Sequence, residues 1–171
     1  AGNCEQQLAN KSNDCGCGFE EGSVCSILSK TWYAHAKSQV SDLSLDWMSN
    51  LPERIVFNHD GLRYGVVHGG ASDISKFVWP VDSDGILEDE FNLLQTQIGK
   101  LDCLVAGHTG IPMIRDFNKK KWLNSGAIGL PSNDGNIDTN FLTITTKNIK
   151  INKLEYDLSL IHISEPTRQE A

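Results

Sequence analysis

Leu104–Gly110 reads L-V-A-G-H-T-G, and this stretch decides the fold. It contains most of a short apolar run, Cys103–Ala106, which stops at a glycine and is followed by His108. Short apolar runs closed by glycine are typical of strands buried on both faces of a parallel sheet. A polar residue just after the carboxyl end of such a strand lies where open α/β sheets bind their ligands. The stretch therefore predicts a central strand with His108 as a candidate functional residue at its end.

The same pattern of strand, histidine and glycine occurs upstream, where the strand candidate Leu62–Val67 (L-R-Y-G-V-V) leads to His68 and two glycines. Between the two runs, Ile86–Lys100 has the spacing of a helix with one apolar stripe, made of Leu87, Phe91, Leu94 and Ile98. A strand, a helix and a strand of this length predict a βαβ unit with parallel strands. Both histidines should then emerge at one edge of one sheet. They are either half of a metal site, since neutral imidazole binds divalent metals well, or residues that only cap strand ends.

The composition indicates one soluble domain of mixed character. The chain has 171 residues, of which 39% are hydrophobic and 22% charged, and no apolar run is long enough to cross a bilayer. The net charge of −7 argues against a general binder of nucleic acid or of membrane surfaces, since no basic stripe offsets it. We therefore expect neither a nucleic-acid polymer nor a membrane as a partner, and the sequence leaves the oligomeric state open.

The five cysteines are an odd number without the spacing of a disulfide framework, which favours a reducing compartment and a cytoplasmic location. Four of them fall early in the chain, at Cys4, Cys15, Cys17 and Cys25. Their spacing is not that of a zinc ribbon. We expect buried or loop thiols here instead of a zinc cluster.

Both ends of the sequence look unusual. The chain begins without methionine, which predicts a fragment truncated at its N-terminus. Leu158–Arg168, L-S-L-I-H-I-S-E-P-T-R, matches the translation of a sequencing adapter. We therefore expect one domain over residues 1–157 and an assembly artefact over residues 158–171. In that tail Leu160, Ile161 and Ile163 should not pack against the domain.

The remaining elements follow from periodicity and turn signals. Ser23 is the predicted N-cap of a helix that has Val24, Ile27, Leu28 and Trp32 on one face. An Asp-Gly pair at residues 60–61 and a lysine run at residues 119–121 predict two hairpin turns. Helices are expected over Glu5–Ala9, Ser23–Gln39 and Asp42–Asn50, and further strands over Arg54–Asn58, Met113–Phe117, Lys121–Leu123, Asn140–Thr146 and Lys150–Tyr156. The pattern predicts a mixed α/β sandwich.

Four sequence blocks resemble those of a known family. G-V-V-H-G-G at 65–70, A-G-H-T-G-I-P at 106–112 and W-L-N-S-G-A-I-G-L-P at 122–131 closely resemble the last three blocks of calcineurin-like metallophosphoesterases. G-N-C-E at 2–5 resembles their G-N-H-[DE] block, in a variant with cysteine that occurs in some bacterial phosphodiesterases. The resemblance extends from Gly2 to about Asp157. It implies an α/β/β/α sandwich of two mixed sheets, here without its first strands.

The same resemblance implies a metal-dependent phosphoesterase that hydrolyses a phosphate mono- or diester through a metal-activated hydroxide. Asn3, His68 and His108 match metal ligands of the family. Cys4 stands where a histidine usually contacts the substrate and assists the leaving group. The implied cofactors are divalent metal ions, Mn²⁺ first, with Fe, Zn, Ni or Mg as alternatives. The implied substrate is a small-molecule or nucleotide phosphate ester.

The chain also departs from the family pattern. Gly110 occupies the position of a second histidine ligand, and the D-x-H and G-D blocks are expected upstream of Ala1. These departures keep an alternative open, namely a non-catalytic binding or scaffold protein on the same fold. If the metal site is formed, the side-chain nitrogens of His68 and His108 should lie within about 5 Å of one another or of Asn3.

Overall fold

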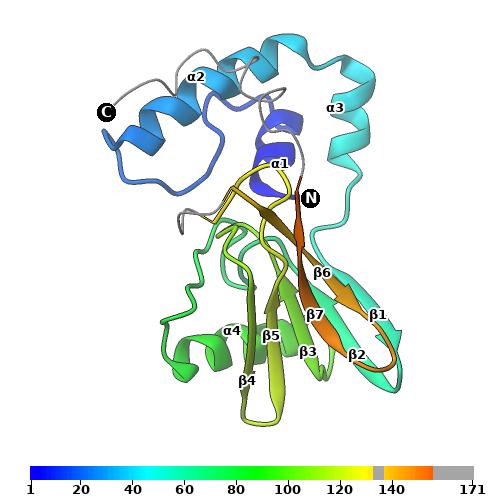
Figure 1. The fold of residues 1–171 in the computed structure, drawn as a ribbon. Helices are drawn as coiled ribbons and strands as arrows, with labels where there is room; N and C mark the ends of the chain where they lie inside the picture. The colour runs from blue at the N-terminus through cyan, green and yellow to red at the C-terminus, as the bar shows by residue number, and fades with distance from the viewer. Residues whose placement is uncertain (133–136, 156–171) are drawn as a thin grey trace.

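The computed structural model describes residues 1–132 and 137–155. The predicted adapter-derived tail, residues 158–171, lies outside the described residues. Helices α1 (Asn3–Ala9), α2 (Val24–Gln39) and α3 (Asp42–Ser49) come first along the chain, and they lie together at one end of the sheet that follows (Figure 1). The sequence predicts each of these helices to within two residues at either end.

A five-stranded mixed sheet forms the body of the molecule. Its elements are β1 (Ile55–His59), β2 (Leu62–Val66), α4 (Asp84–Ile98), β3 (Cys103–Ala106), β4 (Met113–Phe117) and β5 (Lys120–Asn124). The strand order is β1-β2-β3-β5-β4, with β2, β3 and β5 parallel and the two edge strands antiparallel to their neighbours. A second sheet pairs β6 (Thr139–Ile144) and β7 (Ile149–Leu154) in antiparallel fashion. The predicted βαβ unit, β2-α4-β3, is confirmed.

Both predicted hairpins form around residues in the left-handed region. Asp60 and Gly61, with φ of 50° and 76°, join β1 to β2. Asn118 and Lys119, with φ of 45° and 61°, join β4 to β5. The second turn is therefore Asn-Lys, because asparagine tolerates a positive φ, and Lys120 already belongs to the strand.

The sheet body is covered on both faces. On one face, Leu104 and Trp122 pack with the predicted stripe of α4, which supplies Leu87, Phe91, Leu94 and the partly buried Ile98. On the other face, Tyr64, Cys103 and Leu123 pack against residues of β6 and β7, including Leu142 and Ile149. Neighbouring residues of one strand thus face opposite layers, as a sheet buried on both faces requires. The predicted mixed α/β sandwich is confirmed.

Helix α2 forms as predicted, but its buried face differs from its apolar face. Its N-cap is Ser23, whose side chain accepts a hydrogen bond from the Ser26 backbone, as predicted. Val24 and Ile27, however, are 71% and 58% exposed. The buried face carries Ser26, Ser29 and Tyr33, and Tyr33 packs with Leu8 and Cys15. Because these two serines are small, the loop that precedes α2 can pack close to the helix. The Ser29 hydroxyl donates a hydrogen bond to the Ser26 carbonyl.

Among the described residues, no helix is both long enough and apolar enough to span a membrane.

Candidate metal centre

His68 and His108 follow the parallel strands β2 and β3 at the same edge of the sheet. The ladder pairs Val66 with Val105 and continues beyond the strands, where the Gly107 amide donates to the His68 carbonyl at 2.7 Å. His108 Nδ1 then lies 3.1 Å from His68 Nε2. The predicted convergence of the two imidazoles is confirmed, well within the expected 5 Å.

His108 has a strained backbone that its neighbours hold in place. Its φ is 38°, in a region that residues other than glycine seldom adopt. The buried Asn124, at the end of β5, donates from Nδ2 to the Gly107 carbonyl at 2.7 Å. The Thr109 hydroxyl accepts a hydrogen bond from the Val78 amide and donates one to the Val78 carbonyl, both at 3.1 Å. Strain of this kind persists only where surrounding contacts enforce it, and it is typical of functional positions.

Both imidazoles are kept neutral. Burial lowers the pKa of His68, and the neighbouring His108 lowers it further. Burial also lowers the pKa of His108, although the Cys17 carbonyl partly opposes this effect. That carbonyl lies 3.2 Å from His108 Nε2 and can only accept, so a neutral His108 carries its proton there and accepts from His68 at Nδ1. Neutral imidazole is the form that binds metals.

The spacing of the histidine pair also fits a shared cation. Two nitrogens bound at about 2.1 Å to one metal lie about 3.0 Å apart at a right angle and about 3.4 Å apart at the tetrahedral angle. The observed separation of 3.1 Å between Nδ1 and Nε2 falls inside this interval. The separation of the two nitrogens is therefore compatible with ligation of one cation, once each ring turns its lone pair toward that cation.

Asn3 is buried at the start of α1, directly after Gly2. Its neighbour Gly2 packs so closely that a Cβ there would lie 3.0 Å from His68 Cε1, a contact that only glycine allows without displacement. Asn3 Nδ2 donates to the Cys15 carbonyl at 2.9 Å and lies 3.2 Å from Cys17 Sγ. These contacts occupy the amide hydrogens and leave the amide oxygen as the atom that can bind a cation.

Cys4 belongs to a cluster of thiols beside Asn3. Its sulfur lies 3.4 Å from Asn3 Nδ2, and it packs in a small apolar cluster with Leu8 and Tyr33. A hydrogen bond from the Cys17 thiol lowers the pKa of Cys4. The same bond and burial raise the pKa of Cys17. Cys25, by contrast, is exposed near the start of α2.

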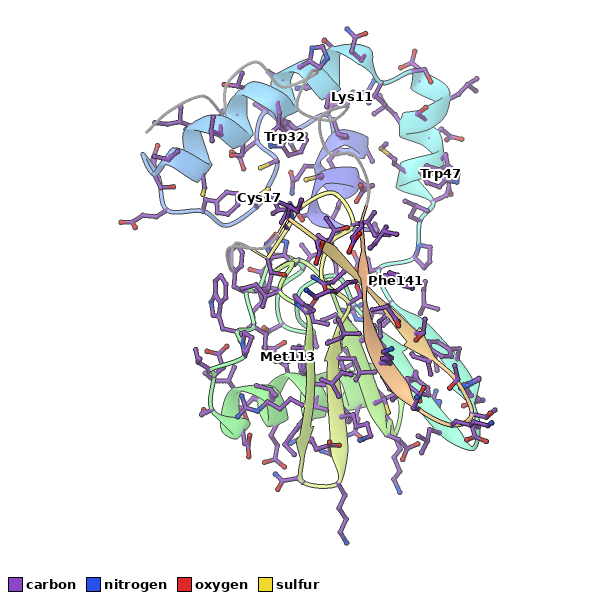
Figure 2. All side chains as sticks on the ribbon, viewed as in Figure 1. Lys11, Cys17, Trp32, Trp47, Met113 and Phe141 are labelled. Atoms are coloured by element: carbon purple, nitrogen blue, oxygen red, sulfur yellow. The ribbon has the colours of Figure 1, made fainter. Side chains whose placement is uncertain are left out.

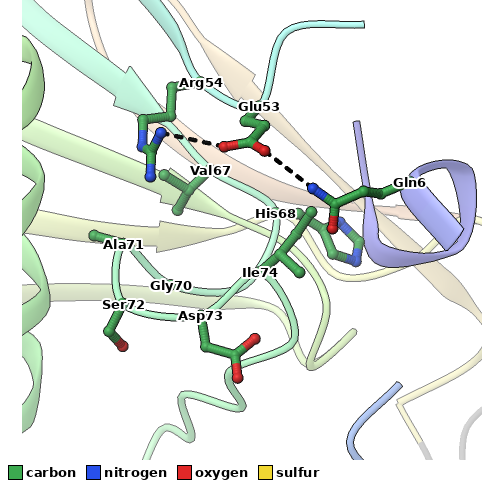
Figure 3. A pocket seen from close by; sticks show the side chains of 10 residues that line it. All are labelled: Gln6, Glu53, Arg54, Val67, His68, Gly70, Ala71, Ser72, Asp73 and Ile74. Atoms are coloured by element: carbon green, nitrogen blue, oxygen red, sulfur yellow. Dashed lines mark hydrogen bonds and ion pairs between the residues drawn. The ribbon is translucent and has the colours of Figure 1, made fainter. Parts of the chain in front are cut away.

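A pocket of about 220 Å³ opens beside His68 (Figure 3). The loop after β2 forms one wall, and Arg54 and Gln6 contribute from other elements. Gln6 donates to Glu53 at 3.0 Å, and Glu53 pairs with Arg54 at 3.3 Å. Arg54 therefore places a guanidinium group at the wall of the pocket, and its Nε atom is itself buried without a hydrogen-bond partner. Cys4 does not line this pocket.

Glu90 of α4 anchors the loop that carries His68, a role that sequence analysis missed. Its buried carboxylate accepts from the backbone amides of Ala71 and Ser72 at 2.7 and 2.9 Å, and it pairs with Lys76 at 2.6 Å. Burial opposes its ionisation, but these donors and the Ser72 hydroxyl outweigh that effect and lower the pKa of Glu90. The available signal was an acidic residue on the apolar stripe of the helix, one position before Phe91.

Phe77 and Asn124 are two further residues beside His108 that sequence analysis gave no role. The Phe77 ring lies 4.5 Å from the His108 ring between centroids and stacks on Trp79 at 5.5 Å. Asn124 lies inside the block W-L-N-S-G, which carried the family resemblance but did not reveal that the side chain holds the His108 turn.

Gly110, where the family pattern has a second histidine, has a φ of 72°. A side chain there would be strained, so this turn is built for glycine. Over residues 1–132 and 137–155, no three His, Cys, Asp or Glu side chains are grouped as a metal site. The candidate ligands are thus two imidazoles that lie together and the amide of Asn3, which shares the neighbour Cys17 with His108; all three groups are neutral, and they fit part of a metal site.

Comparison with known proteins supports the fold. No protein-family model matches the chain, and no curated protein matches it significantly. Among solved structures, the chain is similar to a hypothetical protein from Pyrococcus horikoshii OT3, with a TM-score of 0.67 and 16% identity over 95% of the chain. It is also similar to a metallophosphoesterase from Sphaerobacter thermophilus, with a TM-score of 0.66 and 16% identity over 96% of the chain.

The fold is that of the metallophosphoesterases, as the sequence blocks predicted. In the part that the structure describes, one sheet is mixed and the other is an antiparallel pair. The chain spans 64% of the length of the Pyrococcus protein and 69% of that of the Sphaerobacter protein.

Proposed function

We propose that this chain carries part of the metal site of a phosphoesterase, with Asn3, His68 and His108 as ligands of a divalent cation. The observation that carries the proposal is the 3.1 Å spacing of two neutral imidazoles, those of His68 and His108, at the carboxyl ends of parallel strands, where His108 has a strained backbone. The similarity to a metallophosphoesterase fold supports the same assignment.

In this proposal the cation, Mn²⁺ or another divalent ion, supplies an activated hydroxide and neutralises phosphoryl oxygens. The residues of the chain bind the cation and the phosphate of the substrate. His68 and His108 hold the cation through neutral ring nitrogens, and Asn3 offers its amide oxygen. Arg54, which lines the neighbouring pocket, binds a phosphate oxygen of the substrate through its guanidinium group. Cys4, which contacts Asn3 and Cys17, acts near the leaving group only if its thiol turns toward the substrate.

The substrate in this proposal is a small-molecule or nucleotide phosphate mono- or diester. A pocket of about 220 Å³ is smaller than those that enclose drug-sized ligands, so it would hold only the phosphate and adjoining atoms. All five cysteines are free thiols, which supports the cytoplasmic location proposed from the sequence.

Manganese titration tests the site directly. Binding of Mn²⁺ to the chain is followed by the loss of the free-ion electron paramagnetic resonance signal, in the wild type and in His108→Gly. Glycine accepts the positive φ of this position, so the variant removes the imidazole without straining the backbone. We expect the affinity to fall at least tenfold, or about 1.4 kcal/mol. The exposed His35 provides the matched control, because His35→Ala should leave Mn²⁺ binding unchanged.

Hydrolysis of an aryl phosphate diester and monoester with added Mn²⁺ is then measured on the complete gene product. Activity that survives His108→Gly unchanged would refute the ligand role of His108. Absence of hydrolysis across several metals and esters would favour the second candidate, a non-catalytic binding protein on this fold. The specific observation behind that candidate is Gly110, which has no side chain where the family pattern has a second histidine ligand and whose left-handed backbone favours glycine.

A further inference from the structure

Cys15 and Cys17 bring their sulfurs together beside the candidate metal centre. The two Sγ atoms lie 2.7 Å apart. Between them, Gly16 has a φ of 65°, and this left-handed residue turns the chain so that both side chains point the same way. Cys15 is buried and Cys17 half-buried. Cys17 lies in the zone where the helices meet the end of the sheet (Figure 2).

The separation decides which chemistry this pair suits. Two thiolates bound at about 2.3 Å to one tetrahedral metal lie about 3.8 Å apart. A disulfide bond is about 2.05 Å long. At 2.7 Å the sulfurs are more than 1 Å too close for a shared metal and within about 0.7 Å of a covalent bond. Among the described residues, no group of three potential ligands includes them either.

We propose that Cys15 and Cys17 are a redox modification site, which a hydroperoxide converts to a Cys15–Cys17 disulfide. One thiol sulfur takes the terminal oxygen of the hydroperoxide and becomes a sulfenic acid, while the alcohol leaves. The second sulfur forms the S–S bond, and the sulfenic oxygen leaves as water with the proton of that thiol. Two thiols and one hydroperoxide thus give one disulfide, one alcohol and one water. Glutathione reverses the step by thiol–disulfide exchange.

The modification acts on Asn3, which contacts both cysteines. Asn3 Nδ2 donates to the Cys15 carbonyl and lies 3.2 Å from Cys17 Sγ. Drawing the sulfurs together by about 0.7 Å changes the Cys17 contact of the amide. The Cys17 carbonyl also accepts from His108, so both ends of the candidate metal centre adjoin the pair. The disulfide itself does not depend on the proposed function, whereas its consequence for metal binding does.

Peptide mapping identifies the bond. The reduced chain is treated with hydrogen peroxide, alkylated, and cleaved with trypsin and a glutamate-specific protease. Cleavage after Lys11 and near Glu21 places Cys15 and Cys17 in one peptide, with Cys4 and Cys25 in others. We expect this peptide to lose two hydrogens and to escape alkylation, while Cys4 is alkylated in its own peptide. Addition of glutathione should restore alkylation of both cysteines.

Cys15→Ser and Cys17→Ser should each abolish the mass change, and two variants keep the test valid if one fails to fold. Cys25→Ser is the matched control and should leave the mass change intact. Retention of two alkylated thiols, or a cross-link between the Cys4 and Cys17 peptides, would overturn the proposed pairing. So would tight one-to-one zinc binding by the reduced chain that Cys15→Ser removes.

The contact with Asn3 is tested by nuclear magnetic resonance. The side-chain amide signal of Asn3, identified by its absence in Asn3→Asp, should shift on oxidation of the wild type and stay in place in Cys15→Ser. A disulfide that forms without moving this signal would overturn the coupling to the candidate centre. Because neither readout requires metal or hydrolysis, failure here is distinguishable from failure of the proposed function.

Discussion

The sheet body, formed by β1–β5 and α4, and the helical layer, formed by α1–α3, both contribute to the candidate metal centre, but they hold their residues in different ways. The sheet body supplies His68 and His108 from strands whose neighbouring side chains are fully buried, such as Leu104 and Trp122. The helical layer supplies Asn3, and it exposes large apolar side chains such as Leu43 and Trp47. The histidines are therefore fixed by packing, whereas Asn3 is fixed by a few hydrogen bonds and the close contact at Gly2.

The two kinds of support differ in free energy. Truncating a fully buried large side chain to alanine lowers the free energy of unfolding by about 3–5 kcal/mol, because the loss of buried apolar surface and the cavity left behind both destabilise the fold. A single hydrogen bond contributes about 1 kcal/mol net. Disturbing the helical layer should therefore move Asn3 before it moves the histidines, and disturbing the sheet core should affect the whole molecule.

The largest expected effect tests the sheet body. Trp122 is 0% exposed and packs with Phe91 and Leu94 of α4, so Trp122→Ala should lower the free energy of unfolding by about 3–5 kcal/mol. Urea denaturation followed by circular dichroism measures it. Trp47→Ala is the matched control, since Trp47 is 61% exposed on α3, away from the sheet (Figure 2), and should change stability by less than about 0.5 kcal/mol. Equal losses in the two variants would contradict the difference between the two regions.

A smaller effect is expected where the sheet body holds the His68 loop. Glu90→Gln keeps the shape of the side chain but removes the charge that pairs with Lys76, and it should cost about 1–3 kcal/mol at neutral pH. The pKa of Glu90 is lowered in the folded protein. Its contribution is therefore complete above the unfolded pKa of about 4.3 and is lost as the pH falls through the folded value.

Urea denaturation between about pH 7 and pH 3 measures this dependence. The stability difference between wild type and Glu90→Gln should shrink toward the acid end. Asp89→Asn, on the exposed side of the same helix, is the control and should show no such trend. A difference that stays constant with pH would mean that the charge of Glu90 does not anchor the loop.

The sheet body could be predicted from the sequence because its patterns and its burial agree. The run Cys103–Ala106, the stripe of α4 and the Asp-Gly turn each have one low-energy arrangement, and together they placed His68 and His108 at one edge. Such features follow from local rules, namely the spacing of apolar residues along a helix or strand and the residue preferences of turns.

The helical layer could be predicted only in part, because burial there follows contacts between distant segments. Tyr33 is buried by Leu8 and Cys15, and no local pattern in α2 shows that the face with Ser26 and Ser29 is buried instead of the apolar face. The pairing of Cys15 with Cys17 depends on the positive φ of Gly16, and the role of Glu90 depends on contacts with the loop after β2, such as that with Lys76, 14 residues before it. Such contacts are set by tertiary packing, which overrides local propensity.

The smallest expected effect tests the exposed face of the helical layer. Leu43 is 85% exposed on α3, so Leu43→Gln removes an apolar side chain that contributes little buried area. Leucine and glutamine have similar helix propensities, so the substitution should not weaken the helix itself. We expect the free energy of unfolding to change by less than about 0.5 kcal/mol in urea denaturation. The matched substitution Leu87→Gln, at a position of α4 that is 0% exposed, should instead cost several kcal/mol, since it buries an amide in the core. If Leu43→Gln cost more than about 1 kcal/mol, Leu43 would have to be packed in the folded protein, and the helical layer would be as firmly supported as the sheet body.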